Sequence, residues 1–170
     1  MRFLIRCLFP LPFVVMGFSL YAQILDAPAN IAAALVLKLS AFEKSIASAG
    51  AVRIYVLNAP KVADELRKCL GQHIGQSILD GVQAGNKLPE MKPDILYIGD
   101  SSMLTQALVY TRNKKILSMT GKPDLVKEGV ALGIGVGSDG KPKVILNLSA
   151  TAEENLTWNP AILKMARIIK

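Results

Sequence analysis

Gly99-Asp100-Ser101 is a stretch of the sequence whose residue types could do chemistry. The triplet directly follows an apolar run, and a serine in the turn after a strand can serve as the nucleophile of a hydrolase. Such a serine needs a histidine base, but the only histidine is His73 and no Asp-x-x-His pattern stands near the C-terminus. The favoured interpretation is a strand-to-helix turn in which Ser101 or Ser102 caps the helix.

Three alternating glycines, Gly133, Gly135 and Gly137, could form a phosphate-binding loop. Such loops open a helix, because the amide groups at the helix N-terminus hold the phosphate. Here the glycines precede a turn at Ser138-Asp139-Gly140 and then another apolar run. The pattern therefore indicates a strand with a neighbouring element packed closely over it, or a bulge.

A small-molecule site is an alternative where polar residues follow the predicted strands. The candidate ligand-binding residues are Asn58, Asp100, Ser101 and Thr120. Ligands of open α/β sheets bind at the carboxyl ends of the parallel strands, which is where these residues are expected. In this interpretation the chain is a periplasmic binding domain similar to half of a solute receptor.

The elements that must position these residues follow from hydrophobic periodicity and turn signals. Predicted strands lie at 52–57, 94–98, 115–119, 130–137 and 143–148, with a weaker one at 75–82. Predicted helices lie at 27–49, 60–70, 103–112 and 123–127, and a last helix follows Asn159-Pro160 and runs to about residue 169. Thr151-Ala-Glu-Glu154 adds a capping-box pattern.

The order of these elements determines the predicted fold class. A strand, a helix and a strand at this spacing imply a parallel crossover, whereas Ser138-Asp139-Gly140 makes the last two strands an antiparallel hairpin. We therefore predict an α/β fold: a single domain with a mixed, mostly parallel sheet, flanking helices and a C-terminal antiparallel hairpin.

The first 22 residues have the layout of a secretory signal peptide. Arg2 and Arg6 form a basic start, an apolar run covers residues 7–15, and small residues precede an expected cleavage after Ala22. The run is shorter than the about 20 residues of a membrane anchor and is interrupted by two prolines. We therefore predict a product that works outside the cytoplasm and whose one domain covers residues 23–170.

Composition excludes several function classes for this product. Cleavage lowers the net charge from +7 to +5, because the leader holds two arginines and no acidic residue. The remaining positive charges are scattered without interleaved aromatic residues, so no nucleic-acid partner is predicted. One histidine and one cysteine, Cys69, provide no cluster with metal-ligand spacing, so neither a metal nor a cofactor is expected. Because Cys69 has no partner for an internal disulfide, stability must come from the core.

Three basic residues, Lys164, Arg167 and Lys170, fall three apart on the predicted closing helix. They could form a contact face for anionic lipid or for an acidic partner. Cations near a helix C-terminus are also favoured by the helix dipole, and that is the preferred explanation.

A series of motifs covers nearly all of the predicted mature chain. It begins with Ile54-Tyr55-Val56-Leu57 and continues with residues 93–98, a strand led by Gly129 and a strand that closes in Asn147-Leu148. It ends with Ile162-Leu163-Lys-Met-Ala in the last helix. In this order the motifs resemble the YfiR/HmsC-like family of bacterial periplasmic proteins.

The resemblance implies a non-enzymatic regulator. Well-known members of that family bind the periplasmic part of an inner-membrane diguanylate cyclase and hold it inactive, which lowers cyclic di-GMP and restrains biofilm formation. The expected partner is therefore a membrane-anchored diguanylate cyclase or sensor kinase, and a homodimer is compatible with the resemblance. The chain departs from the family in two ways. Residues 37–44 replace a stretch that often contains Trp-Pro, and Cys69 alone cannot form the disulfides of some members. The matching positions build the fold, so no binding residue is carried over.

Overall fold

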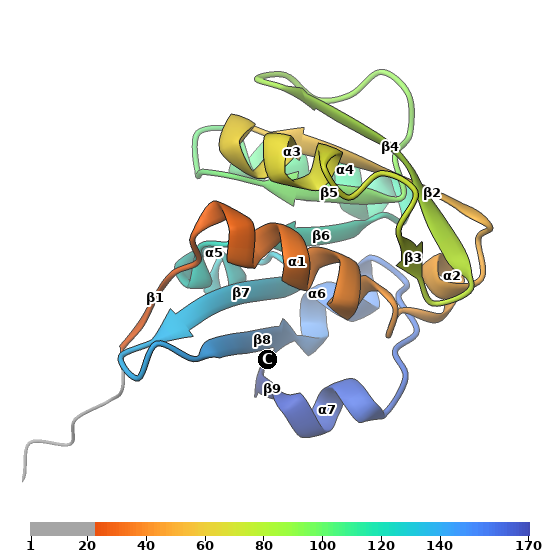
Figure 1. The fold of residues 1–170 in the computed structure, drawn as a ribbon. Coiled ribbons are helices and arrows are strands. Elements are labelled where there is room, and N and C mark those ends of the chain that lie inside the picture. Colours follow the sequence, from red (N-terminus) through yellow and green to blue (C-terminus); the bar gives the residue numbers. More distant parts are fainter. Residues whose placement is uncertain (1–22) are drawn as a thin grey trace, which may run out of the picture.

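Nine strands pair into one sheet across residues 23–170, the part of the chain that the computed structural model describes (Figure 1). The strands are β1 (Ile24–Asp26), β2 (Ala51–Leu57), β3 (His73–Ile74), β4 (Ser77–Gly85), β5 (Ile95–Ile98), β6 (Leu117–Thr120), β7 (Leu132–Gly137), β8 (Pro142–Asn147) and β9 (Ala166–Ile169). The helices are α1 (Ala29–Ser40), α2 (Lys44–Ala47), α3 (Pro60–Arg67), α4 (Leu104–Lys114), α5 (Pro123–Lys127), α6 (Leu148–Glu153) and α7 (Ala161–Met165). The predicted signal peptide lies outside the described residues.

The sheet is mixed and mostly parallel. Its strand order is β3-β4-β2-β5-β6-β7-β8-β9, and β1 also pairs with β7. Strands β4, β2, β5, β6 and β7 run parallel to their neighbours in that series, and so do β8 and β9. Strands β7 and β8 form the predicted antiparallel hairpin, so the fold class is confirmed. From β2 the chain goes first to β4 on one side and then to β5 on the other, which makes the β2–β5 boundary a topological switch point.

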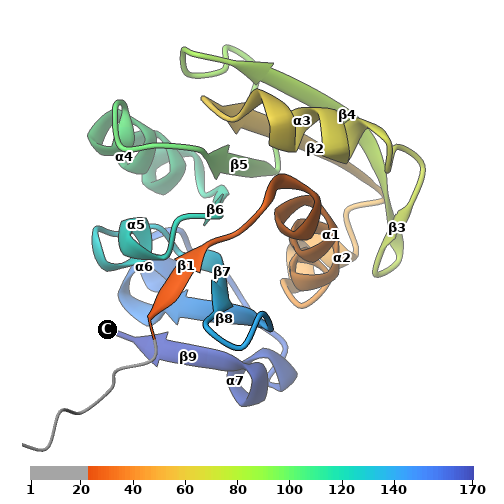
Figure 2. The same cartoon turned by 60° about the vertical axis from the view of Figure 1, so that its left-hand side comes forward.

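Each face of the sheet has its own hydrophobic core, and β5 contributes to both. All four of its residues are buried: Ile95 and Tyr97 belong to the core under α1 and α3, and Leu96 and Ile98 to the core under α4. Figure 2 shows α1 lying between the part of the sheet that contains β2 and the part that contains β7 and β8. The prediction that residues 94–98 form a strand covered on both faces is confirmed.

The predicted helix at residues 27–49 is wrong in its middle, because α1 ends at Ser40 and a separate short helix, α2, begins at Lys44. Between them Glu43 is extended and buried, and its side chain accepts hydrogen bonds from the amides of Ile46 and Thr157, both at 2.9 Å. The carbonyl of Phe42 accepts from the amide of Asn159 at 2.7 Å. The break lets the chain bind a segment more than 110 positions away, a tertiary contact that periodicity does not reveal.

The glycines of β7 allow two elements to pack against the sheet at close range. A Cβ atom at Gly133 would overlap the side chain of Val126 in α5, and one at Gly135 would overlap Ile24 of β1 and lie 2.7 Å from Pro123. The close-packing interpretation of these glycines is therefore confirmed. Both residues face the same side of β7, so α5 packs on that side, and the side chain of Ile24, from the paired strand β1, reaches over it as well.

The capping-box prediction at residues 151–154 is wrong, because the helix starts earlier. Asn147 caps α6: its side-chain oxygen accepts from the amide of Ala150 at 3.0 Å, and its side-chain amide donates to the carbonyl of Val126 at 2.9 Å. Thr151 lies inside the helix and donates to the carbonyl of Asn147 at 2.7 Å. A buried asparagine at the end of β8 therefore begins α6, and the threonine does not.

The predicted last helix is also wrong beyond Met165. Only α7 is helical, and Ala166–Ile169 forms β9, which pairs parallel to β8 with Ala166 opposite Val144 and Ile169 opposite Asn147. A short apolar run is compatible with a helix or a strand in sequence, and here pairing with β8 makes it a strand. Because Lys164 lies in α7 and Arg167 in β9, the two do not share a helix, so neither a basic helix face nor the preferred helix-dipole explanation holds for both.

Glu154, which directly follows α6, fills a gap between two strands. Strands β6 and β7 pair at Met119–Thr120, and just before that point the Glu154 carboxylate accepts from the amide of Ser118 at 2.9 Å. Burial raises the pKa of Glu154 to about 7, against the opposing effects of hydrogen bonds from Ser118 and of the nearby Arg112. The folded chain therefore favours the protonated carboxyl.

This raised pKa makes a prediction about stability and pH. A carboxyl that holds its proton more tightly when folded stabilises the fold below its unfolded pKa, and this stability is lost as the pH rises through the folded pKa. For Glu154 the loss lies between about pH 4.5 and 7 and amounts to about 3 kcal/mol at most. Urea unfolding from pH 5 to 8 should show this fall in wild type, and Glu154→Gln should reduce it. Glu128→Gln, at an exposed position, should leave this pH dependence as in wild type. If the free energy of unfolding falls equally with pH in wild type and in Glu154→Gln, the prediction is contradicted.

Candidate functional site

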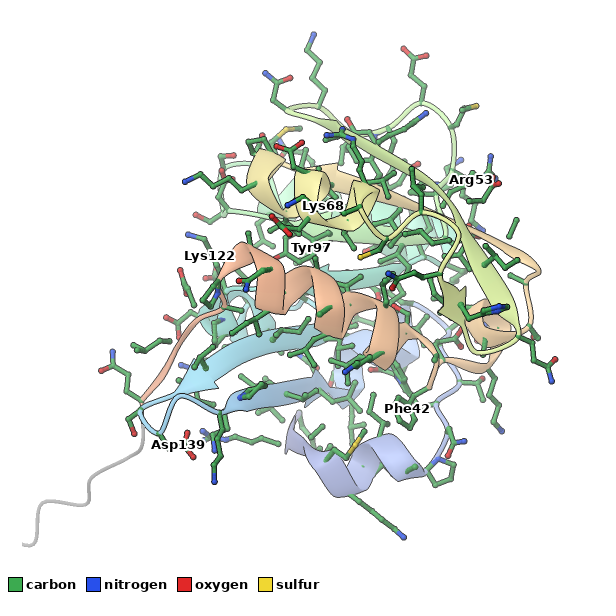
Figure 3. All side chains as sticks on the ribbon, viewed as in Figure 1. Phe42, Arg53, Lys68, Tyr97, Lys122 and Asp139 are labelled. Carbon is green, nitrogen blue, oxygen red and sulfur yellow. The ribbon has the colours of Figure 1, made fainter. Side chains whose placement is uncertain are left out.

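The residues predicted as a ligand site lie at one edge of the sheet, where parallel strands end. Asn58 follows β2, Asp100 and Ser101 come two and three residues after β5, and Thr120 ends β6. In Figure 3 the labelled Lys122, which follows β6, lies at this carboxyl-end edge, and Arg53 of β2 lies toward the opposite edge. Asn58, Asp100 and Ser101 therefore flank the switch point between β2 and β5, and Thr120 lies one strand farther along the sheet.

Two of the four predicted residues are joined directly. The side-chain amide of Asn58 donates to Asp100 Oδ1 at 3.2 Å and to Ser102 Oγ at 2.9 Å. Asn58 has a φ of 54°, a left-handed conformation that asparagine tolerates better than most residues. Gly99 allows the two loops to approach, because a Cβ atom there would overlap the backbone of Asn58. We call Asn58, Asp100 and Ser102 the switch-point cluster.

The Asp100 carboxylate is the acceptor at the centre of this cluster. Its Oδ1 accepts from the hydroxyl of Ser102 at 2.5 Å and from the amide of Ser102 at 2.9 Å. The hydroxyl of Ser102 is the main cause that lowers the pKa of Asp100, and the amide of Ser102, Asn58 and the charge of Lys122 lower it further. The predicted cap at Ser101 or Ser102 is therefore wrong: Met103 is the N-cap of α4 and forms no side-chain cap bond, and Asp100 orders the turn before it.

The other two predicted residues do not join the cluster. Ser101 is exposed, and its carbonyl accepts from the amide of Leu104. Its hydroxyl forms no hydrogen bond to residues 23–170. Thr120 is fully buried, donates to the carbonyl of Ile98 at 2.8 Å and accepts from the amide of Lys122 at 3.1 Å. Its hydroxyl therefore forms its hydrogen bonds with the backbone at the ends of β5 and β6.

Ser101 has no histidine base near it. His73 lies in β3 beside Ile78, and Ile78 pairs with Ala51 at the start of β2, whereas Ser101 lies beyond the carboxyl end of the neighbouring β5. The length of a seven-residue strand, on the order of 20 Å, separates the two ends. The geometry does not support a serine hydrolase that uses Ser101 and His73.

Space for a ligand beside the cluster is limited. A hollow of about 260 Å³ lies next to Asn58, between the end of β2 and the end of β4. Its lining is mainly apolar or small: Val56, Asn58, Ala59, Pro60, Ala84, Gly85 and Asn86. The donors and acceptors of the cluster are largely used within it. Between residues 23 and 170 no three His, Cys, Asp or Glu side chains are grouped to hold a metal ion.

Sequence reasoning missed two features that matter for function. It named Ser102 only as a cap candidate, because nothing in the sequence shows which of two adjacent hydroxyls faces Asn58. It also could not find exposed apolar side chains, which alternate with buried ones along the same elements. The large exposed ones in the described part of the chain are Leu25, Leu70, Ile78, Met91, Val109, Leu163, Met165 and Ile168. None of the helices in that part is long and apolar enough to span a membrane.

Comparison with known proteins relates the chain to one family and one fold. The model of a family described as YfiR/HmsC-like matches residues 29–167, from the start of α1 into β9. A search of curated proteins gives no match. The crystal structure of a conserved domain protein from Vibrio cholerae O1 biovar El Tor strain N16961 is similar, with a TM-score of 0.52 and 14% sequence identity. The similarity covers 85% of this chain and only 60% of that one, and at this identity it shows the fold alone.

The hydrogen bonds of the switch-point cluster predict unequal effects for two adjacent positions. Asp100→Ala removes the acceptor of the turn before α4 and leaves Asn58 with one partner, so the free energy of unfolding should fall by about 1–2 kcal/mol. Ser101→Ala removes a hydroxyl that forms no hydrogen bond within the described residues, so the change should stay within about 0.5 kcal/mol. Urea denaturation of both variants checks this; equal losses would show that the cluster does not hold the turn.

Proposed function

Because the chain belongs to the YfiR/HmsC-like family, we propose that it is a non-enzymatic periplasmic regulator that binds a membrane-anchored signalling protein. The family supports a periplasmic regulatory role in cyclic di-GMP signalling in general terms. The finer proposal is that the partner is a diguanylate cyclase or a sensor kinase, bound through its periplasmic segment. The observation that carries this proposal is the family match over residues 29–167.

The proposed mechanism is differential affinity. A protein that binds one state of its partner more tightly than another shifts the partner toward that state, and the shift is limited by the difference in the two binding free energies. Such a regulator needs a stable surface and no catalytic group. Extensive burial on both faces of the sheet is consistent with a rigid binding surface.

Control by an internal disulfide is not part of the proposal. Cys69 is the single cysteine of residues 23–170, and it is half-buried beside the carbonyl of Glu65 at 3.5 Å. A reversible disulfide within the mature chain would need a second cysteine. The proposed regulator therefore responds through binding.

A small-molecule binding domain is the second candidate. It is favoured by one observation: Asn58 and Asp100 meet at the switch point, beside a hollow of about 260 Å³. This is the position at which open α/β sheets bind ligands. The proposed site would consist of Asn58 and Asp100, with Ser101 and Thr120 as the further residues expected from the sequence.

Chemical crosslinking of the tagged chain in its native envelope tests the regulator proposal. We expect mass spectrometry of the captured material to identify a membrane protein with a periplasmic segment and a cytoplasmic cyclase or kinase domain. If the partner is a cyclase, deletion of the regulator should raise cyclic di-GMP. Recovery of only the protein itself would contradict the proposal and favour the small-molecule candidate.

A further inference from the structure

Strand β9 leaves one end of the sheet open. It is the last strand in the order, and apart from β8 no strand in residues 23–170 pairs with it. An open edge presents backbone N–H and C=O groups that can pair with a strand from another chain. At the other end of the sheet, β3 covers the start of β4 through His73 and Ile74.

The side chains around β9 are unusually apolar for a solvent-facing edge. Leu163 is 49% exposed, Met165 51% and Ile168 37%, so three large exposed hydrophobic side chains fall within six positions of α7 and β9. The free part of the β4 edge differs, because its apolar residues Leu79 and Val82 are buried and half-buried, and its other residues are small or polar: Asp80, Gly81, Gln83, Ala84 and Gly85. Exposed apolar side chains that are grouped in this way mark interaction surfaces.

Two hollows lie beside this edge. One, of about 550 Å³, is lined by Gln23, Ile24, Pro123, Asp124, Lys127, Ile145, Arg167 and Ile169. The other, of about 490 Å³, is lined by Ile24, Pro142, Lys143, Val144, Met165 and Arg167. Because Ile24 and Arg167 line both, the hollows adjoin each other. Both lie on the face of the sheet that α5 covers, because Arg167 is in register with Ile145 and Ile145 with Gly133. Side chains of an added strand alternate between the two faces, so those on the face of Arg167 can reach toward these hollows.

The positive charge of this surface favours an acidic partner strand. Lys127 pairs with Asp124 at 2.8 Å and Lys143 with Asp139 at 3.3 Å, but Lys164 and Arg167 form no ion pair within the described chain. Both are exposed, so the edge has uncompensated positive charge. A second copy that paired through β9 would bring the same cations together, whereas an acidic segment would neutralise them.

We propose that the β9 edge, with Leu163, Met165, Arg167 and Ile168, is the docking surface for an extended partner segment that alternates acidic and apolar residues and adds to the sheet as a tenth strand. Backbone hydrogen bonds to β9 would supply affinity, and the two hollows and Arg167 would supply specificity. This proposal rests on the proposed function, since the segment would belong to the periplasmic part of the membrane partner.

Site-specific photocrosslinking in the native envelope tests the surface. The probe, benzoylphenylalanine, replaces Ile168 in one variant and Val109 in another, where Val109 is a 53% exposed apolar residue of α4. We expect the Ile168 probe to capture the membrane partner at a segment rich in Asp and Glu, and the Val109 probe to capture it at least about tenfold less. Arg167→Glu should lower the capture from position 168 by about tenfold. Lys61→Glu, the same charge change at an exposed position of α3, should leave it within about twofold.

Several results would overturn the proposal. Capture of a second copy of the chain, of lipid, or of a partner segment without acidic residues at position 168 would contradict the proposed occupant. Equal capture from positions 168 and 109 would contradict the location. If chemical crosslinking captures the membrane partner but the Ile168 probe does not, the docking surface is wrong and the proposed function stands. If neither captures one, the proposed function itself fails.

Discussion

The close approach of α5 and β1 to the glycines of β7 is the constraint on which the rest of the structure depends. Gly133 and Gly135 have no Cβ, and atoms there would overlap Val126 and Ile24. On the opposite face of β7, Leu132 and Ile134 are fully buried in the core that contains α1. Strand β7 thus pairs with β6, β8 and β1 while elements pack on both of its faces. Larger residues at the two glycines would force these elements apart at a cost of about 1–3 kcal/mol each.

Strand β7 separates two regions of different chemistry. Toward β2, the parallel strands end in the switch-point cluster, in which Asn58, Asp100 and Ser102 mostly satisfy one another. Toward β9, the outer edge of the last strand pairs with nothing else in residues 23–170, and the nearby cations Lys164 of α7 and Arg167 of β9 lack acidic partners there. Hydrogen-bonding groups that are already satisfied gain little from a ligand, whereas an open edge gains from each backbone bond that forms. The two regions therefore differ in what they can offer a partner.

Sequence patterns predicted those elements whose local signals agree with the fold. The apolar run at 94–98, the helical turn at Pro123–Lys127 and the hairpin between β7 and β8 are each defined by nearby residues. Two failures depend on distant contacts: Glu43 breaks the first helix to bind Thr157, and pairing with β8 turns the predicted helix after Met165 into β9. In the candidate site, the sequence indicated Asn58 and Asp100 but not the choice of Ser102 over Ser101. That choice depends on side-chain orientation in a turn, which residue type does not determine.

Amide hydrogen exchange tests the central claim, that a partner binds by extending the sheet at β9. The comparison is between the chain alone and the chain bound to the periplasmic segment of the captured membrane protein. New backbone hydrogen bonds should slow exchange in Ala166–Ile169 by at least about tenfold and leave Asn58 and Asp100 unchanged. Slowed exchange at the ends of β2 and β5, with no change in β9, would contradict the account.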